Sequence, residues 1–493
     1  MRRPFKGLKQ DPAAVYDAVV IGAGVGGLIC ANLLARAGLR TLLVEQHYMV
    51  GGYCSTFRRG GFTFDAATHF YPLLGNPATI TGAVLARIGS RTAWVKMDPV
   101  DHFHFPDGTS FSVPADFDQY MAMLEAAFPH ESVGLNSFLA VARYAYLYGL
   151  LYYFRGREHE RLEHIRLLTL RDMLDRHVRD PKLKLLLSGD CAHWGSPPSR
   201  TSFVFDSMLR LSYFLGNYYP QGGSQAFVDD LARQFEELGG DILMHSSVDR
   251  IVVEDGAATG VEIDTPAGGR THRVRVRAGH VISNADLVLT MERLLGPGVI
   301  GDEAMRVVKR LRPTYPCFLT HIGLRDMPVD PLRHAAGYHW RSWDPDRVMT
   351  DTFKIFVPTM YEPALGPAGG QIVILQRVMD VEYDAITDWT AHKKAVEADL
   401  MARFEAAVPG ISAHIVTVQS ASAFTSWRYT LNYQGAMLGW EMSPDQLGPE
   451  RPGIEGPVRN LYFVGHWTRP GGGITPVIVS AMNAASAITG SDG

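Results

Sequence analysis

A glycine-rich loop near the start of the chain has the spacing of a site that binds the pyrophosphate of a dinucleotide. Gly22, Gly24 and Gly27 form a GxGxxG pattern, with Gly26 just before the last glycine. The apolar residues 17–21 before it predict a short buried parallel strand, and the small residues after it predict a helix. Gly22 permits the tight turn, Gly24 lets the pyrophosphate approach the backbone, and Gly27 lets helix and strand pack closely.

An acidic residue follows where such a site binds ribose. Residues 41–45 predict a second strand, and Glu45 at its tip lies 18 positions after the last glycine of the motif. A carboxylate there accepts hydrogen bonds from ribose hydroxyls and disfavours a 2′-phosphate, so the pattern indicates FAD or NAD and not NADP. A second GxGxxG match at 296–301 follows a helical stretch, and its Pro297 would break the helix that the pattern should open. We therefore expect a loop there.

A second glycine pair lies just past this acid and favours FAD over NAD. An extended dinucleotide needs more backbone donors along its pyrophosphate, and Gly51, Gly52 and Ser55 can provide them. We expect Gln46 and Arg58, on either side of this pair, to contact the cofactor as well. The alternative is an ordinary surface turn.

Another glycine-rich loop lies near the opposite end of the chain. Residues 461–464 predict a buried strand, and the glycine triplet 471–473 leads into a helix rich in Ala and Ser. Such a loop lets the backbone come close to a flat ligand, and the helix start offers free N–H groups and a positive dipole end. This suits the electron-rich side of a flavin ring. The residues of this end that we expect to bind the cofactor are Gly465, Gly473, Ile474, Thr475 and Val477, the last two near the ring.

These blocks, in this order, resemble the phytoene desaturase and carotenoid isomerase group of flavoproteins, within the superfamily of amine oxidases and GDP dissociation inhibitors. The resemblance covers nearly the whole chain. Further shared blocks are 61–69, 219–227, 248–251 and 281–286. It implies FAD as cofactor, with a backbone contact from Val248 to adenine and a further contribution from Asn284 in the last of these blocks.

Two histidines are the candidates for catalysis that the resemblance suggests. His69 ends the block that the family places on the substrate side of the flavin, and it would transfer a proton if its pKa were suitable. A hydrogen-bonded structural histidine is the alternative. His466 stands where the family commonly has an acid that binds the ribityl chain of FAD, and it can still donate a hydrogen bond. A flavin itself accepts or donates hydride, so no catalytic triad or metal site is expected, and none is found in the sequence.

The predicted fold class is α/β, with a discontinuous Rossmann-like FAD-binding domain and a mixed α+β substrate domain. The chain has 493 residues, which exceeds a single ordinary core. We expect residues 12–100, 215–300 and 455–493 to form the FAD-binding domain. Residues 101–214, which are mostly helical and rich in aromatic side chains, and residues 305–454 would form the substrate domain.

Composition excludes several other classes of protein. Hydrophobic residues make up 46% and charged residues 20% of the chain, which excludes disorder. The net charge of −4 gives a nucleic-acid partner no electrostatic support. Four scattered cysteines indicate reduced thiols, and neither a signal peptide nor an apolar run of about 20 residues is seen. These features predict a cytoplasmic protein.

The aromatic residues at 138–154 and 203–219 leave two interpretations open. They are the core of a helical layer, or they form the mouth of an apolar tunnel that dips into the inner face of a membrane. The neighbouring basic residues Arg155, Arg157, Arg161 and Arg166 favour an anionic membrane surface, but Glu158, Glu160 and Glu163 are interleaved with them. A solvated helix face would look the same.

Three functions are compatible with the sequence. The first is an FAD-dependent desaturase or cis–trans isomerase acting on a long apolar polyene such as a carotenoid, with quinone or O₂ as external electron acceptor in a desaturation. The second is an amine-oxidase-like or saturase enzyme acting on another small molecule. The third is a non-catalytic lipid carrier of the GDP dissociation inhibitor type, against which the two complete glycine-rich ends argue.

Overall fold

The first of two large sheets joins the two ends of the chain. The computed structural model describes residues 4–155, 159–267 and 270–490. Strand β1 (Val15–Ile21) pairs in parallel with β2 (Thr41–Val44) and β13 (Arg270–Ser283), β10 (Asp241–Leu243) extends the sheet beyond β2, and β19 (Leu461–Phe463) pairs in parallel with β13. The antiparallel strands β12 (Ala257–Ala267) and β11 (Ser247–Glu254) complete its seven strands. The predicted α/β class with a Rossmann-like part is confirmed.

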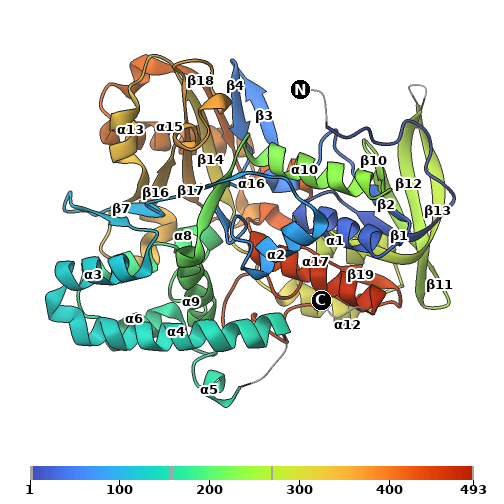
Figure 1. Cartoon of the computed structure of the whole chain (residues 1–493), viewed down its shortest axis with the longest axis horizontal. Helices are drawn as coiled ribbons and strands as arrows, with labels where there is room; N and C mark the ends of the chain where they lie inside the picture. Colours follow the sequence, from blue (N-terminus) through green and yellow to red (C-terminus); the bar gives the residue numbers. More distant parts are fainter. Residues whose placement is uncertain (1–3, 156–158, 268–269, 491–493) are drawn as a thin grey trace.

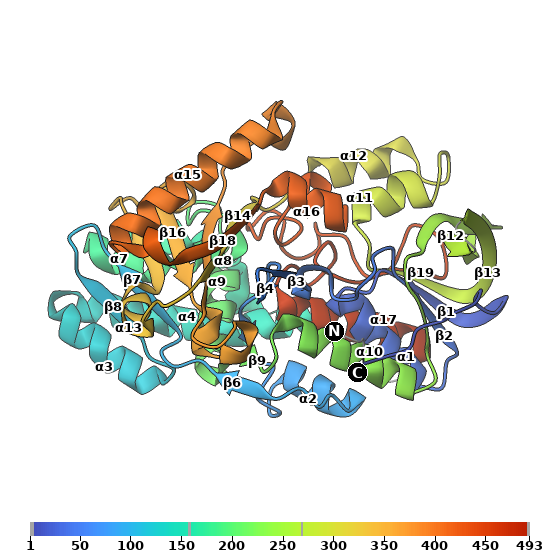
Figure 2. The same cartoon turned by 90° about the horizontal axis from the view of Figure 1, so that it is seen from above.

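Three helices cover one face of this sheet. They are α1 (Val25–Arg36), α10 (Ser224–Glu237) and α17 (Ile474–Thr489), and they share a hydrophobic core with Ala18 and Val20 of β1. Helices α1 and α17 lie side by side in both views although they come from opposite ends of the sequence (Figure 1, Figure 2). The fold therefore brings the two glycine-rich loops, which precede these two helices, to the same edge of the sheet.

Two segments in this part of the fold are a loop and a pair of strands. Residues 296–301, the second GxGxxG match, form the expected loop after a short helix, α11 (Leu287–Leu289), and a π-helical turn (Thr290–Leu294). Residues 241–254 form two separate strands. The chain breaks after β10 and resumes as β11, because β10 pairs in parallel with β2 whereas β11 pairs antiparallel with β12.

The second large sheet has the order β18-β14-β17-β16-β15-β7-β8. Its strands are β7 (Asp101–His104), β8 (Ser110–Val113), β14 (Cys317–Leu324), β15 (Gly337–Trp340), β16 (Thr352–Phe356), β17 (Gln371–Val378) and β18 (Ile415–Ala421). Helices α13 (Val329–Ala335) and α15 (Trp389–Ala407) pack through Leu332, Leu400 and Phe404 into one core with this sheet. Two smaller sheets hold β3 (Thr56–Arg59) with β4 (Phe62–Asp65), and β5 (Tyr71–Pro72) with β9 (Asn217–Pro220) and β6 (Trp94–Lys96).

A helical layer lies below this sheet in Figure 1. Its helices are α3 (Phe117–Ala127), α4 (Ser132–Arg155), α5 (Glu160–Glu163), α6 (Leu170–His177), α7 (Pro181–Ser188), α8 (Cys191–Trp194) and α9 (Phe203–Ser212). Two further helices lie elsewhere, α2 (Ile80–Ile88) beside α1 and α12 (Asp302–Arg310) beyond α11. Within the helical layer, Phe138 of α4 and Phe203 of α9 are buried against each other in the core.

None of the helices in the described ranges is long and apolar enough to cross a bilayer. The basic and acidic positions Arg157 and Glu158, considered above for a membrane surface, lie outside the described residues.

Candidate functional site

A cavity of about 1150 Å³ opens at the edge of the first sheet and continues to the second sheet. Its volume exceeds what one small ligand needs, because ordinary ligand pockets measure about 300–1,000 Å³. The predicted site residues that line it are Gly22, Gly24, Gly26, Glu45, Gln46, Gly51, Gly52, Ser55, Arg58, His69, Val248, Asn284, Gly465, His466, Gly473, Ile474, Thr475 and Val477. The remaining one, Gly27, lies behind the lining, where a Cβ would come within 2.1 Å of the carbonyl oxygen of Gly22.

The first glycine loop presents bare backbone to the cavity. Gly24 is the N-cap of α1 and no side chain caps the helix, so the N–H groups of its first turn face outward. Gly51 pairs with Gly24 in a parallel bridge and donates its N–H to the Ala23 carbonyl at 2.8 Å. The second glycine pair therefore lies directly against the first loop. This double cradle at a helix N-terminus suits a pyrophosphate.

Asn284 closes the cradle from the side of β13. A Cβ on Gly26 would lie 2.5 Å from the Asn284 side-chain oxygen and 3.2 Å from the Gly465 backbone nitrogen. The Asn284 amide donates to the Gly22 carbonyl at 3.3 Å. Gly26 is thus the point where the N-terminal loop, β13 and the C-terminal loop meet, and any larger residue would force them apart.

Glu45 is half-buried just after β2 and is held by backbone donors. Its two carboxylate oxygens accept hydrogen bonds from the N–H groups of Ala23 and His47, both at 2.8 Å. Burial raises the pKa of Glu45, and these backbone hydrogen bonds oppose the shift. The carboxylate keeps further lone pairs with which to accept from ribose hydroxyls.

The C-terminal loop leads into a second uncapped helix. Gly473 is the N-cap of α17 with φ 98°, and no side chain caps it. Behind the loop, the guanidinium of Arg451 is 1% exposed and donates to the carbonyls of Trp440 and Glu441 at 2.9 and 2.8 Å. A Cβ on Gly471 would lie 3.3 Å from Arg451 Nη1. A buried positive charge therefore adds to the positive end of the helix dipole on this side of the cavity.

His466 offers the cavity an acceptor, not the donor expected from the sequence. Trp467 donates its indole N–H to Asn432 Oδ1 at 3.0 Å, which identifies that atom as an acceptor. His466 Nε2 lies 3.1 Å from the same oxygen, so Nε2 carries the proton. Burial, with the nearby charge of Arg451, lowers the pKa of His466 to about 3. The ring is therefore neutral with an unprotonated Nδ1, which accepts a hydrogen bond as a carboxylate does.

His69 is neutral as well. Its Nδ1 donates to the Ala67 carbonyl at 2.9 Å, and the ring lies 4.6 Å from that of Phe356. Burial and the charge of Lys354 lower its pKa to about 3. The remaining nitrogen, Nε2, is left as an unprotonated acceptor. His69 thus has the state of a general base, although its low pKa makes it a weak one.

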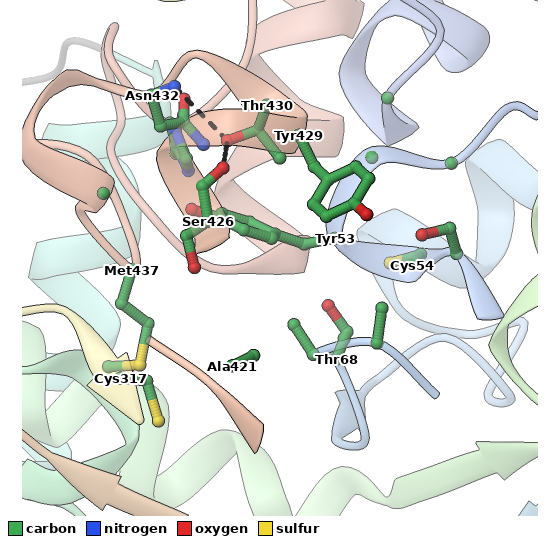
Figure 3. A pocket seen from close by; sticks show the side chains of 18 of the residues that line it. Tyr53, Cys54, Thr68, Cys317, Ala421, Ser426, Tyr429, Thr430, Asn432 and Met437 are labelled. Carbon is green, nitrogen blue, oxygen red and sulfur yellow. Dashed lines mark hydrogen bonds between the residues drawn. The ribbon is translucent and has the colours of Figure 1, made fainter. Parts of the chain in front are cut away.

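The cavity has a buried interior and an exposed mouth. Figure 3 looks into it: Met437 and Cys317 lie on one side, Thr68 lies on the other, and Asn432 lies above. The mouth is formed by the start of α15 and by α16 (Ala423–Thr430), where Phe424 is 38% and Tyr429 58% exposed. No residue of α4 lines the cavity in the described part of the chain, so the aromatic residues of that helix do not form a tunnel mouth.

Comparisons with known proteins fit this geometry. The profile of flavin-containing amine oxidoreductases matches residues 25–489. The chain belongs to this family. It is 28% identical to a lycopene-forming phytoene desaturase of Pseudescherichia vulneris, covering 95% of this chain and 98% of the relative. It is 26% identical to a chloroplastic prolycopene isomerase of an Oncidium hybrid cultivar, covering 97% and 84%.

A solved structure shares the fold of this flavoprotein. An oxidoreductase from Methanosarcina mazei aligns with a TM-score of 0.65 at 18% identity, covering 94% of this chain and 99% of the other. The protein is accordingly a flavin-dependent oxidoreductase. The residues fit such a cofactor: two uncapped helix starts, glycines without room for a Cβ and a half-buried acid all border one cavity.

Several lining or supporting residues were not found from the sequence. Asn432 fixes His466, and Arg451 stands behind the glycine triplet, yet neither belongs to a recognisable motif. His193, Tyr213 and Gln376 line the buried part of the cavity from three separate elements. Of these three residues, only Tyr213 lies in a segment that the sequence had marked, the aromatic-rich stretch 203–219.

Proposed function

We propose that this flavoprotein binds FAD and acts on a long apolar polyene such as a carotenoid, by desaturation or by cis–trans isomerisation. The observation that carries the proposal is one continuous cavity, which joins a dinucleotide-type glycine cradle to an interior lined by Leu209, Leu319 and Met437. The names of the relatives, a phytoene desaturase and a prolycopene isomerase, support both reactions.

Different residues would bind different parts of the cofactor. Gly24 and Gly52 would bind the pyrophosphate through backbone N–H groups, and Glu45 would accept from a ribose. The N–H groups of Gly22 and Gly51 donate to the carbonyls of Val44 and Ala23, so these two glycines would shape the loop and let the pyrophosphate approach. When bound, the flavin supplies the redox chemistry: two hydrogens leave the substrate in a desaturation, with quinone or O₂ as final acceptor, whereas an isomerisation has no net redox change. Arg451 and the start of α17 would stabilise negative charge on the ring.

Anaerobic incubation tests this function. The flavin-loaded protein is mixed with carotenoids, amines and fatty acids, the flavin absorbance is followed, and the products are analysed for isomers. We expect bleaching or a changed isomer pattern with the polyenes alone. Bleaching by an amine, with no change in any polyene, would overturn the proposal in favour of an amine-oxidase-like enzyme. A protein that takes up no flavin would overturn it in favour of a carrier.

We also propose that the mouth of the cavity contacts a membrane surface containing anionic lipids. Trp389 and Phe424 stack with ring centroids 6.2 Å apart, Phe424 and Trp427 follow at 5.6 Å, and Trp427 is 40% exposed. The basic residues Lys393 and Lys394 line the same mouth. Exposed aromatic rings beside basic side chains are typical of interfacial binding, and an apolar substrate would then pass from the bilayer into the cavity.

A further inference from the structure

The buried part of the cavity carries polar groups that a hydrocarbon substrate would not need. Strand pairing places them in one row across the second sheet: Leu319 of β14 is opposite Gln376 of β17, which is opposite Lys354 of β16, which is opposite Tyr338 of β15. Paired residues point to the same face of a sheet. Leu319 and Gln376 line the cavity, so this row faces it.

Lys354 is the fixed charge at the centre of this row. It is 2% exposed and donates to Asp101 Oδ2 at 2.6 Å, and its Nζ lies over the rings of Phe70 and Tyr338 at 4.5 and 4.6 Å. It also lies 3.1 Å from His193 Nε2. An ammonium group has donors only, so His193 Nε2 is the acceptor.

This contact orients the polar groups that line the cavity. Burial lowers the pKa of His193 well below its usual value, so the ring is neutral and its single proton sits on Nδ1. Nδ1 lies 3.3 Å from the hydroxyl of Tyr213, which accepts that hydrogen bond. The hydroxyl keeps its own proton, for which the described residues provide no acceptor. Tyr213 therefore presents an oriented donor where it lines the cavity.

Gln376 supplies a matching acceptor. It is 5% exposed, and its side-chain oxygen has no hydrogen-bond partner among the described residues. A buried polar atom without a partner costs free energy that a ligand can recover by bonding to it. A donor and an acceptor that both lack partners, in the buried part of one cavity, match a group that both accepts and donates.

We propose that the substrate is a polyene with an oxygen-bearing end group, a hydroxyl in particular, and that Tyr213 and Gln376 bind this oxygen. The inference rests on the proposed function and narrows its substrate class. In this arrangement Asp101, Lys354 and His193 are positioning residues, since they act on the substrate oxygen through Tyr213. The oxygen would fix which end of the chain enters first, and hence which carbon–carbon bonds reach the flavin.

A binding comparison tests the proposal. The flavin-loaded protein is titrated with two polyenes of the same length and conjugation, one a hydrocarbon and one with a terminal hydroxyl, each delivered in the same phosphatidylcholine vesicles. Binding is read from the absorbance shift of the polyene. We expect the hydroxylated polyene to bind about tenfold more tightly. Tyr213→Phe and Gln376→Leu should each reduce this ratio to within about threefold while leaving hydrocarbon binding intact.

Tyr338→Phe is the matched control. Tyr338 lies in the same row and is 1% exposed, its hydroxyl also lacks a partner among the described residues, but it does not line the cavity. Tyr338→Phe should keep the full ratio of the affinity for the hydroxylated polyene to that for the hydrocarbon. Equal binding of the two polyenes by the unmodified protein, or an unchanged ratio in both variants, would overturn the inference and leave the proposed function standing. If neither polyene binds, the proposed function and this inference fail together.

Discussion

Replacing Gly27 with alanine should weaken flavin binding, whereas the same change at Gly301 should not, although both are third glycines of a GxGxxG match. A Cβ on Gly27 would lie 2.1 Å from the Gly22 carbonyl oxygen and 3.2 Å from Asn284 Cβ. The first of these atoms is backbone, so no side chain can swing away and α1 must retreat by roughly 1 Å. A Cβ on Gly301 would meet no atom within 4 Å, and its φ of −67° suits alanine.

The expected size of the effect follows from two opposing terms. Gly→Ala inside a helix ordinarily stabilises by about 1 kcal/mol. Overpacking against fixed backbone costs about 1–3 kcal/mol, so the net loss of folding stability in Gly27→Ala is about 0–2 kcal/mol. The effect on binding is larger, because the displaced helix start would lose at least one hydrogen bond to a charged phosphate, worth about 1.5–3 kcal/mol. The dissociation constant for FAD should therefore rise at least about tenfold.

The measurement is a fluorescence titration of flavin-free protein with FAD, together with the flavin content of each protein as purified. Thermal unfolding of both variants separates lost binding from lost folding. Gly301→Ala should match the unmodified protein in all three measurements. Full flavin content and unchanged affinity in a folded Gly27→Ala protein would show that the close packing of α1 on the loop is not what positions the cofactor.

Three further outcomes are expected. His466→Asp should keep the affinity for FAD within about threefold because it preserves an acceptor beside Arg451, whereas His466→Leu should weaken it about tenfold in the same titration; equal affinities in both variants would contradict the acceptor role. In the folded chain the pKa values of His69 and His466 are lowered from 6.5 to about 3. Between these pH values the unfolded chain therefore binds protons at both histidines that the folded chain does not bind. The free energy of unfolding should therefore fall by about 1.4 kcal/mol per pH unit for each histidine as the pH drops from 6.5 toward 3, measured by denaturant titration, and a flat profile to pH 4 would refute this. The double variant Phe424→Ser, Trp427→Ser should lose at least about tenfold in flotation with anionic vesicles, whereas Trp343→Ser, which removes an equally exposed ring elsewhere, should not.

The position of the cavity mouth could not be predicted from the sequence. The density of aromatic residues at 138–154 suggested a tunnel there, but those on α4 pack into the helical core or lie outside the cavity. The mouth is built instead from Trp389 at the start of α15 and from Phe424 and Tyr429 on the short helix α16. Composition measures how many aromatic rings a segment has, whereas exposure depends on which elements cover it.

His466 illustrates a subtler limit. The sequence identified it as the position where the related proteins have an acid, but it gave no information on which ring nitrogen carries the proton. That depends on Asn432, which is 34 positions away and is itself fixed as an acceptor by Trp467. Chemical type could be predicted, but the protonation state could not, because a tautomer is set by the neighbours that folding supplies.

The glycine-rich half of the cavity could be predicted from the chain alone. Gly22 to Gly27, the flanking strand and helix, and Glu45 are local in the chain, and their geometry follows from backbone sterics that operate over a few residues. Tertiary structure alone decided the substrate half. Lys354 and Gln376 become neighbours only through the register of β16 on β17, and His193 reaches them from a helix in another layer. Contacts of that kind depend on long-range packing, which no short pattern in the sequence encodes.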